Sequence, residues 1–254
     1  SSTMMITPVN DAPIVSAPVS FTVTEDVKGN LVWPATSMPF ADVDSASLTV
    51  TLAVADGTIS AASTAAVTVG GTATARTFTG TPAALNTYFK TAGAIGYTTA
   101  RDNTTARTLT TTVSDGSLST QVSSIINITP VNDAPTINAA ATLGGGSVGT
   151  AFEITYDVLR AALNVADVDT ASPSILITAV DSGTVQKWNG TSWVTVSTAA
   201  TAPLSQRLLS AGGKIRWVPQ AGVSGGRAAF KVNARDGVLN STVTAQVTIN
   251  LAPA

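Results

Sequence analysis

The stretch Thr129-Pro130-Val131-Asn132-Asp133-Ala134-Pro135 also occurs, residue for residue, at positions 7–13. Seven identical residues repeated within a chain of 254 indicate an internal repeat. The prolines at both ends disfavour helix and keep the backbone extended. Between them lie an amide and a carboxylate side chain, both of which offer oxygen ligands. The stretch therefore predicts a stiff linker between two domains, with the capacity to hold a cation.

The repeat divides the chain into two expected modules, residues 1–131 and 132–254, with linkers at 7–13 and 129–135. Other motifs recur at nearly the same distance. An Asp-x-Asp pair at Asp42 and Asp44 returns at Asp167 and Asp169, and the Asp-Gly at 115–116 returns at 236–237. Insertions are therefore expected in the loops between strands that both modules share.

Strand signals dominate each module. Residues 48–54 alternate apolar and polar side chains, while residues 66–78 and 109–128 each resemble a hairpin. A short helix is expected after Thr81, closed near Gly93. About seven short strands per module, with turn signals between them, predict two all-β Greek-key sandwiches of the cadherin or immunoglobulin type, arranged end to end.

The composition excludes several classes of function. The chain has no cysteine and no histidine, so disulfides, Ser-His-Asp or Cys-His catalysis and histidine-bound zinc are impossible. No apolar run approaches the ~20 residues of a membrane helix. With a net charge of −2 and no basic patch in the sequence, nucleic acid is not an expected partner. No signal peptide is visible, and the chain resembles a piece of a longer, extracellular repeat array.

The acidic residues are placed unevenly, and that placement predicts a metal. Ten of the 15 Asp and Glu residues lie in linkers, Asp-x-Asp pairs, Asp-Gly turns or strand ends: Asp11, Glu25, Asp42, Asp44, Asp102, Asp115, Asp133, Asp167, Asp169 and Asp236. Like charges gathered at the poles of a sandwich repel unless they are neutralised. Ca²⁺ accepts six to eight oxygen ligands in flexible geometry, whereas Mg²⁺ requires a tighter octahedron, so calcium is the expected ion.

These motifs resemble the cadherin-like tandem repeats of giant bacterial surface adhesins, including the RTX type. The Val-Asn-Asp-Ala-Pro linker is similar to the Asp-x-Asn-Asp-Asn linker of cadherins. Asp167-Val-Asp169 is similar to the Asp-x-Asp motif that follows it, and residues 234–237 resemble the later Ala-x-Asp motif. Glu25 resembles the early carboxylate, with Thr in place of the usual Pro before it, and residues 101–103 loosely resemble the Leu-Asp-Arg-Glu segment.

The resemblance implies one complete calcium site between the modules and a matching half-site before the first. The complete site would use Glu25, Asp102, Asn132, Asp133, Asp167, Asp169 and Asp236, with Asp26 as a further candidate. The half-site would use Asn10, Asp11, Asp42, Asp44 and Asp115. The far end of the second module departs from this pattern, since residues 219–222 carry no acid and the counterpart of Glu25 is open between Glu153 and Asp157.

Simpler interpretations stand beside the metal. Asn and Asp of the linker could cap backbone amides, the Asp-x-Asp pairs could form turns, and Asp-Gly is an ordinary hairpin signal. Asp56 and Asp181 are expected to form turns only. Trp188 and Trp193 flank an Asn-Gly turn and either pack across a hairpin or offer a sugar-stacking platform. Trp217 is expected in the core.

The expected function is mechanical and non-catalytic. The resemblance implies a monomeric, calcium-stiffened stalk segment of a secreted bacterial adhesin, serving cell adhesion and biofilms, whose partners are neighbouring repeats of the same chain. The alternative is a module that binds a glycan, a peptide or a surface protein through the tryptophan hairpin. An enzyme would have to rely on paired carboxylates, which lie here in linkers and not in a cleft.

Overall fold

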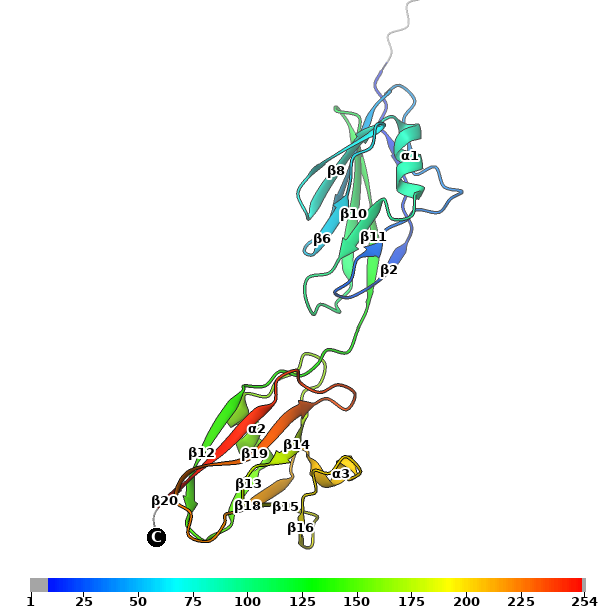
Figure 1. The fold of residues 1–254 in the computed structure, drawn as a ribbon. Helices are drawn as coiled ribbons and strands as arrows, with labels where there is room; N and C mark the ends of the chain where they lie inside the picture. The colour runs from blue at the N-terminus through cyan, green and yellow to red at the C-terminus, as the bar shows by residue number, and fades with distance from the viewer. Residues whose placement is uncertain (1–8, 253–254) are drawn as a thin grey trace, which may run out of the picture. The chain divides into compact units, whose positions relative to one another are not determined.

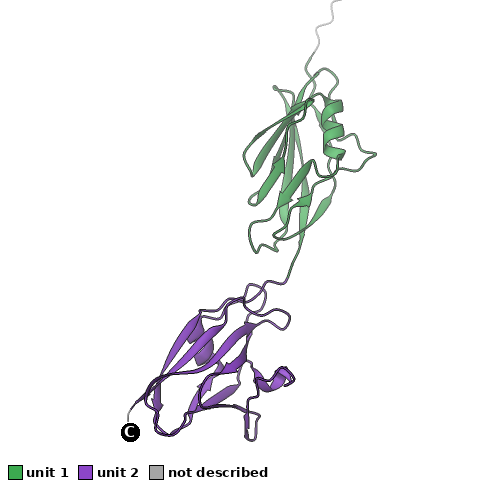
Figure 2. Cartoon of the chain, viewed as in Figure 1, with its two compact units in different colours: residues 1–131 green, residues 132–254 purple. Residues whose placement is uncertain are grey.

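A computed structural model describes residues 9–252, so Thr7 and Pro8 of the first linker lie outside the described residues. The chain divides into two compact units, residues 1–131 and 132–254, which Figure 2 colours separately. Each unit has its own buried hydrophobic cluster. None of the helices within the described range has the length and hydrophobicity that crossing a membrane would require.

Unit 1 contains two β-sheets, one short two-stranded sheet and one helix (Figure 1). The larger sheet has the strand order β2-β11-β10-β5-β8-β7, and the smaller one has the order β3-β9-β6. The elements are β1 Ile14–Val15, β2 Ser20–Thr24, β3 Gly29–Asn30, β4 Phe40–Ala41, β5 Leu48–Ala53, β6 Thr58–Ala61, β7 Val67–Gly71, β8 Ala75–Gly80, α1 Pro82–Lys90, β9 Ile95–Thr98, β10 Arg107–Ser114 and β11 Ser119–Thr129.

Unit 2 repeats this topology but differs in its helices and short edge strands. Its sheets have the orders β12-β20-β19-β14-β17 and β13-β18-β15-β16. The elements are β12 Ala140–Ser147, β13 Phe152–Thr155, α2 Tyr156–Leu163, β14 Ser174–Val180, β15 Thr184–Trp188, β16 Trp193–Thr195, α3 Leu204–Arg207, β17 Leu208–Leu209, β18 Lys214–Val218, β19 Gly225–Arg235 and β20 Ala245–Ala252. The expected all-β sandwich fold is confirmed in both units.

In each unit the first long strand pairs in parallel with the last one. β2 lies beside β11 in unit 1, and β12 lies beside β20 in unit 2. All other strand pairs in the two large sheets are antiparallel. Because the parallel strands run in the same direction, the chain reaches each unit at one pole and leaves it at the opposite pole. The acidic residues discussed below lie at these poles.

The core follows from the alternation of side chains along the strands. In β5 the residues Leu48, Val50 and Leu52 are buried, while the threonines between them are partly exposed. Trp217 is fully buried in unit 2, as expected from the sequence, and its indole Nε1 donates to the carbonyl of Ser182 at 2.7 Å.

Two glycines of unit 1 differ sharply in the space around them. Gly57 has φ +79°, and a Cβ atom there would lie 2.6 Å from the carbonyl oxygen of Thr98, whereas Gly116 has φ +102° and no atom within 4 Å. We expect Gly57→Ala to destabilise unit 1 by about 2–4 kcal/mol, from backbone strain and overpacking together. Gly116→Ala should cost only about 1–2 kcal/mol, because it meets the backbone strain alone. Urea unfolding of both variants checks this difference, and equal losses would contradict it.

Candidate metal centre

Five residues that the sequence singled out come together at the N-terminal pole of unit 1. The side chain of Asn10 donates to Oδ2 of Asp115 at 2.8 Å, and the backbone N–H of Asp11 donates to Oδ2 of Asp44 at 3.0 Å. Oδ1 of Asp42 accepts from the amides of Asp44 and the following residue, at 3.0 and 2.8 Å. The linker, the Asp-x-Asp pair and the Asp-Gly turn therefore form one hydrogen-bonded cluster.

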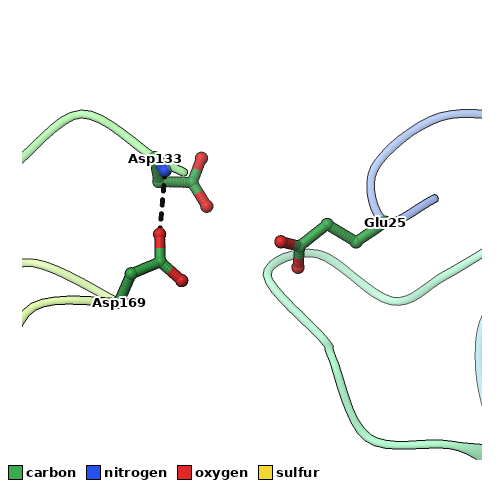
Figure 3. Close-up of side chains that lie close together, drawn as sticks. All are labelled: Glu25, Asp133 and Asp169. Carbon is green, nitrogen blue, oxygen red and sulfur yellow. Dashed lines mark hydrogen bonds between the residues drawn. The ribbon is translucent and has the colours of Figure 1, made fainter. Parts of the chain in front are cut away.

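The same contacts recur at the N-terminal pole of unit 2. Asn132 donates to Oδ2 of Asp236 at 2.7 Å, and the backbone N–H of Asp133 donates to Oδ2 of Asp169 at 2.8 Å, the bond drawn in Figure 3. Oδ1 of Asp167 accepts from the amide of Asp169 at 2.9 Å. Carboxylate oxygens of Asp133 and Asp169 lie within 4.8 Å of each other. Two copies of the sequence motif thus produce the same arrangement of donors and carboxylates.

One carboxylate oxygen in each cluster is buried without a partner. Oδ2 of Asp42 and Oδ2 of Asp167 are inaccessible to solvent, and no hydrogen-bond donor among residues 9–252 reaches either of them. Leaving a buried acceptor unsatisfied is costly, and native structures rarely do so. A hollow of about 360 Å³ is lined by Asp11, Ile14 and Asp42 among others. A carboxylate oxygen is the kind of ligand that a hard cation such as Ca²⁺ prefers.

Hydrogen bonds keep several of these carboxylates ionised. The pKa of Asp42 is lowered chiefly by the hydrogen bond from the backbone N–H of Asp44, and the pKa of Asp115 is lowered chiefly by that from the backbone N–H of Leu118. Burial raises the pKa of Asp236, but donors that include the Asn132 side chain outweigh it, and the net pKa is lowered. These side chains therefore keep their negative charge until the pH falls below the ordinary pKa range of aspartate. Any stability or cation affinity that depends on this charge is lost over the same low pH range.

The C-terminal pole of unit 1 holds a second group of acids. Glu25 is only 1% exposed, and its Oε1 accepts from the backbone N–H of Val131 at 2.5 Å. Oδ1 of Asp26 accepts from the N–H of Asp102 at 3.1 Å, and carboxylate oxygens of the two side chains lie within 4.8 Å. Both aspartates have positive φ, 58° and 53°. The backbone thus adopts a rare conformation that brings two carboxylates together.

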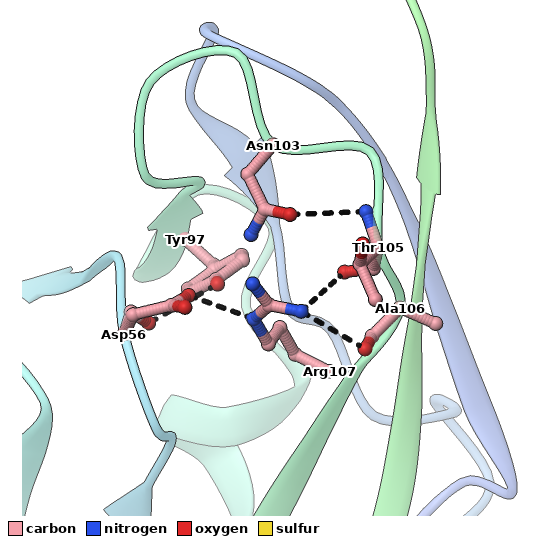
Figure 4. Close-up of polar contacts among 6 residues, drawn as sticks. All are labelled: Asp56, Tyr97, Asn103, Thr105, Ala106 and Arg107. Carbon is pink, nitrogen blue, oxygen red and sulfur yellow. Dashed lines mark hydrogen bonds and ion pairs between the residues drawn. The ribbon is translucent and has the colours of Figure 1, made fainter.

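An ion pair that the sequence did not suggest anchors the loop carrying Asp102. Nε of Arg107 donates to Oδ1 of Asp56 at 2.8 Å, and its Nη1 donates to the carbonyl of Thr105 at 2.9 Å, as Figure 4 shows. The side-chain oxygen of Asn103 accepts from the N–H of Thr105 in the same loop. Asp56 therefore does more than form a turn, and the arginine lowers its pKa.

The C-terminal pole of unit 2 has a different chemistry. In unit 1 the N–H of Glu25 donates to the carbonyl of Thr129, and the matching bond in unit 2 runs from Val148 to Ala252. Val148 therefore occupies the place of the buried glutamate. Of the two acids that the sequence left open for this role, Glu153 is paired with Lys214 at 2.9 Å, and Asp157 lies in the first turn of α2. Neither one is the counterpart of Glu25.

The tryptophan hairpin also forms a defined structure. Trp188 and Trp193 are directly opposite each other on β15 and β16, with ring centroids 5.3 Å apart. Nζ of Lys214 lies 5.4 and 5.1 Å from the two rings, and Cζ of Arg216 lies 4.7 Å from the ring of Trp193. The rings pack across the hairpin, with cations over them, and do not form an open stacking platform.

No family model matches this chain, and no curated protein matches it. Several solved structures resemble its fold. An endo-fucoidan hydrolase of glycoside hydrolase family 107 is 16% identical over 98% of this chain and 30% of its own, with a TM-score of 0.28. Extracellular cadherin domains 1–5 of protocadherin gamma B2 are 13% identical over 80% of this chain and 33% of theirs, with a TM-score of 0.36. Human mucin-like protocadherin EC1-2 is 15% identical over 95% of this chain and 98% of its own, also with a TM-score of 0.36.

The chain thus spans about 30% of the length of the hydrolase. The strand order defines the class of protein: each unit is a cadherin-like or immunoglobulin-like β-sandwich.

Proposed function

We propose that this chain is a calcium-rigidified extender segment of a bacterial cell-surface adhesin of the RTX type, with no catalytic role. One observation carries the proposal. Asp42 and Asp167, at matching positions of the two repeats, each hold one oxygen on backbone amides and leave the other buried without a partner. A structural turn requires only Oδ1, which accepts from the backbone amides. Binding of Ca²⁺ would also explain why Oδ2 is buried without a hydrogen-bond donor.

The linker itself supports a mechanical role. The backbone N–H of Val131 is bonded to Glu25 of unit 1, and the side chain of the next residue, Asn132, is bonded to Asp236 of unit 2. Two consecutive residues therefore connect the linker to an acidic side chain of each unit. When bound, Ca²⁺ would supply charge neutralisation at the acidic poles that flank the linker, which include Glu25, Asp26 and Asp102 of unit 1 and Asp133, Asp167 and Asp169 of unit 2. Such ligation would restrict rotation about the linker.

The same chemistry supports an extracellular setting. Extracellular modules typically bind Ca²⁺ with a Kd of about 10⁻⁴–10⁻³ M, so such sites fill only where free calcium is abundant. In this proposal the chain is monomeric, is exported, and contacts neighbouring repeats of the same adhesin. Because Val148 stands where Glu25 stands in unit 1, the junction that follows unit 2 would not use the same ligand set.

Removal of calcium tests the mechanism. Small-angle scattering of the two-unit chain should give a narrow distribution of distances in calcium and a broader one in EGTA, while circular dichroism shows both sandwiches still folded. Asp133→Ala should reproduce the effect of EGTA in calcium buffer. Asp181→Ala is the matched control, because that aspartate is paired with Lys231 in the body of unit 2. A scattering profile that calcium does not change would overturn the proposal.

A second candidate function is ligand binding at the tryptophan hairpin. The observation in its favour is the cluster of two indole rings and two cations on β15, β16 and β18.

A further inference from the structure

The middle of unit 2 is strongly basic in a chain that is acidic overall. Between Asp181 and Asp236 the sequence contains no acidic residue and seven basic ones, although the whole chain has a net charge of −2. The basic residues are Lys187, Arg207, Lys214, Arg216, Arg227, Lys231 and Arg235. Most acids of unit 2 belong instead to its N-terminal pole. A segment with this charge attracts anions.

The outward face of the sheet β13-β18-β15-β16 gathers part of this charge around the two tryptophans. Trp188 and Trp193 form a cross-strand pair, and Lys214 and Arg216 extend from β18 over their rings. The carboxylate on this face belongs to Glu153, which is paired with Lys214 at 2.9 Å. Arg216 has no acidic partner among the described residues. We call these five side chains the tryptophan face.

The groups that remain available on the tryptophan face are mainly hydrogen-bond donors. Arg216 uses Nε to donate to Gln186 at 2.6 Å, which leaves its terminal nitrogens for a ligand. Within the described part of the chain, neither Nε1 of Trp188 nor Nε1 of Trp193 has an acceptor. The buried Trp217, by contrast, donates to a carbonyl. A surface of cations and unpaired N–H groups is complementary to an anion rich in acceptors.

A pocket of about 410 Å³ lies at the same hairpin, on the face that carries Lys187 and Val194 and opposite the paired tryptophan rings. Its lining residues also include Asn189, Ser205 and Gln206, whose side chains carry amide and hydroxyl groups. Lys187 closes one side, with Nζ bonded to the carbonyls of Ser205 and Leu208 at 2.8 and 2.7 Å. The volume lies in the range of small-molecule sites, and the hydroxyl and amide side chains that line the pocket suit a sugar unit.

We propose that the tryptophan face binds an acidic polysaccharide. Sulfate or carboxylate groups of the glycan contact Arg216, Lys214 and the indole N–H groups, and a further sugar unit of the same polymer reaches the pocket on the opposite face of the hairpin. Single-stranded nucleic acid fits less well, since it requires open ring faces on which bases stack, and cations lie over these rings. The inference does not depend on calcium, because none of these residues belongs to an acidic pole.

The test is calorimetry of the full two-unit chain at physiological ionic strength in EGTA. Dextran sulfate, polygalacturonate, uncharged dextran and single-stranded DNA serve as probes. We expect binding to at least one of the two charged polymers and none to dextran, and the preferred polymer distinguishes sulfate from carboxylate recognition. Arg216→Ala should weaken binding about tenfold, the effect of losing one charged hydrogen bond. Trp193→Phe keeps a ring under the cations and removes one N–H, so it should weaken binding about threefold.

Arg227→Ala is the matched control, because it removes the same charge from β19, in the other sheet of unit 2. It should leave the affinity unchanged. Four results would each overturn the inference: no binding to either charged polymer, equal losses in Arg216→Ala and Arg227→Ala, equal affinity for single-stranded DNA, or binding that occurs only when calcium is present. The last result would mean that the polymer binds to calcium held at an acidic pole and not to the tryptophan face. The present inference can therefore fail while the calcium proposal holds, and the reverse is also true.

Discussion

Asp167→Asn is expected to lower the calcium affinity of unit 2 at least about tenfold. The substitution is nearly isosteric and separates two roles of the side chain. Oδ1 accepts from the amides of Asp169 and Thr170 at 2.9 and 2.6 Å, and an asparagine oxygen can keep both bonds. The buried Oδ2 has no hydrogen-bond partner. The substitution replaces this oxygen by an NH₂ group, which cannot bind a cation, and it also removes the negative charge.

The sign of the effect should depend on calcium. Without the ion, Asp167→Asn removes a charge that lies close to Asp169, so the stability of unit 2 should stay the same or rise. With saturating calcium, the variant should melt at a lower temperature than the native chain, because the ion stabilises only the folded state that binds it. Calorimetric titration with calcium, and melting temperatures measured with and without calcium, check this reversal in the order of stability, which we call the crossing. Asp42→Asn should show the same crossing in unit 1, and Asp181→Asn should show none.

If Asp167 forms only a turn, its substitution by asparagine is neutral in both buffers. A melting temperature that does not respond to calcium in the native chain would also contradict the prediction.

The sequence predicted the strands and the first helix from local signals. In α1 the Thr81 side chain accepts from the N–H of Ala84, as the predicted cap requires. The helix ends at Lys90 with Thr91 as its C-cap, and the predicted closing residue Gly93 lies in the turn that follows, with φ +80°. The second helix, α2, was missed, although Thr155 caps it and Asn164 ends it in the left-handed conformation. The parallel with unit 1 does not predict this helix, since residues 31–40 of unit 1 contain prolines and are irregular.

The acidic poles were predictable because each cluster is built from motifs with recognisable spacing. What local patterns could not show were contacts set by the register of distant strands. Glu25 is buried against the amide of Val131, 106 residues away, and the Arg107–Asp56 pair joins residues 51 apart. The counterpart of Glu25 in unit 2 required the parallel pairing of β12 with β20, which identifies Val148. The nature of the ion stays a prediction that Asp167→Asn tests.

Phe89→Ala is expected to lower the melting temperature of unit 1 by about 10 °C or more, a loss of about 3–5 kcal/mol. Phe89 is fully buried at the end of α1, and its ring lies 4.8 Å from Trp33, 4.7 Å from Phe40 and 5.0 Å from Phe78. Its backbone carbonyl also accepts from the N–H of Trp33. The ring therefore connects the helix, the irregular segment and a strand of the larger sheet.

Unit 2 should not respond to this change, because its core is a separate cluster that is mainly aliphatic around Trp217, Tyr156 and Phe230. Differential scanning calorimetry in EGTA should show one transition lowered and the other unchanged. Phe89→Leu should cost less, since it restores part of the lost volume. The reciprocal variant Phe230→Ala should lower only the second transition. If either substitution lowers both transitions together, the two units unfold cooperatively even without calcium. The units would then be coupled mechanically by something other than a calcium-stiffened linker.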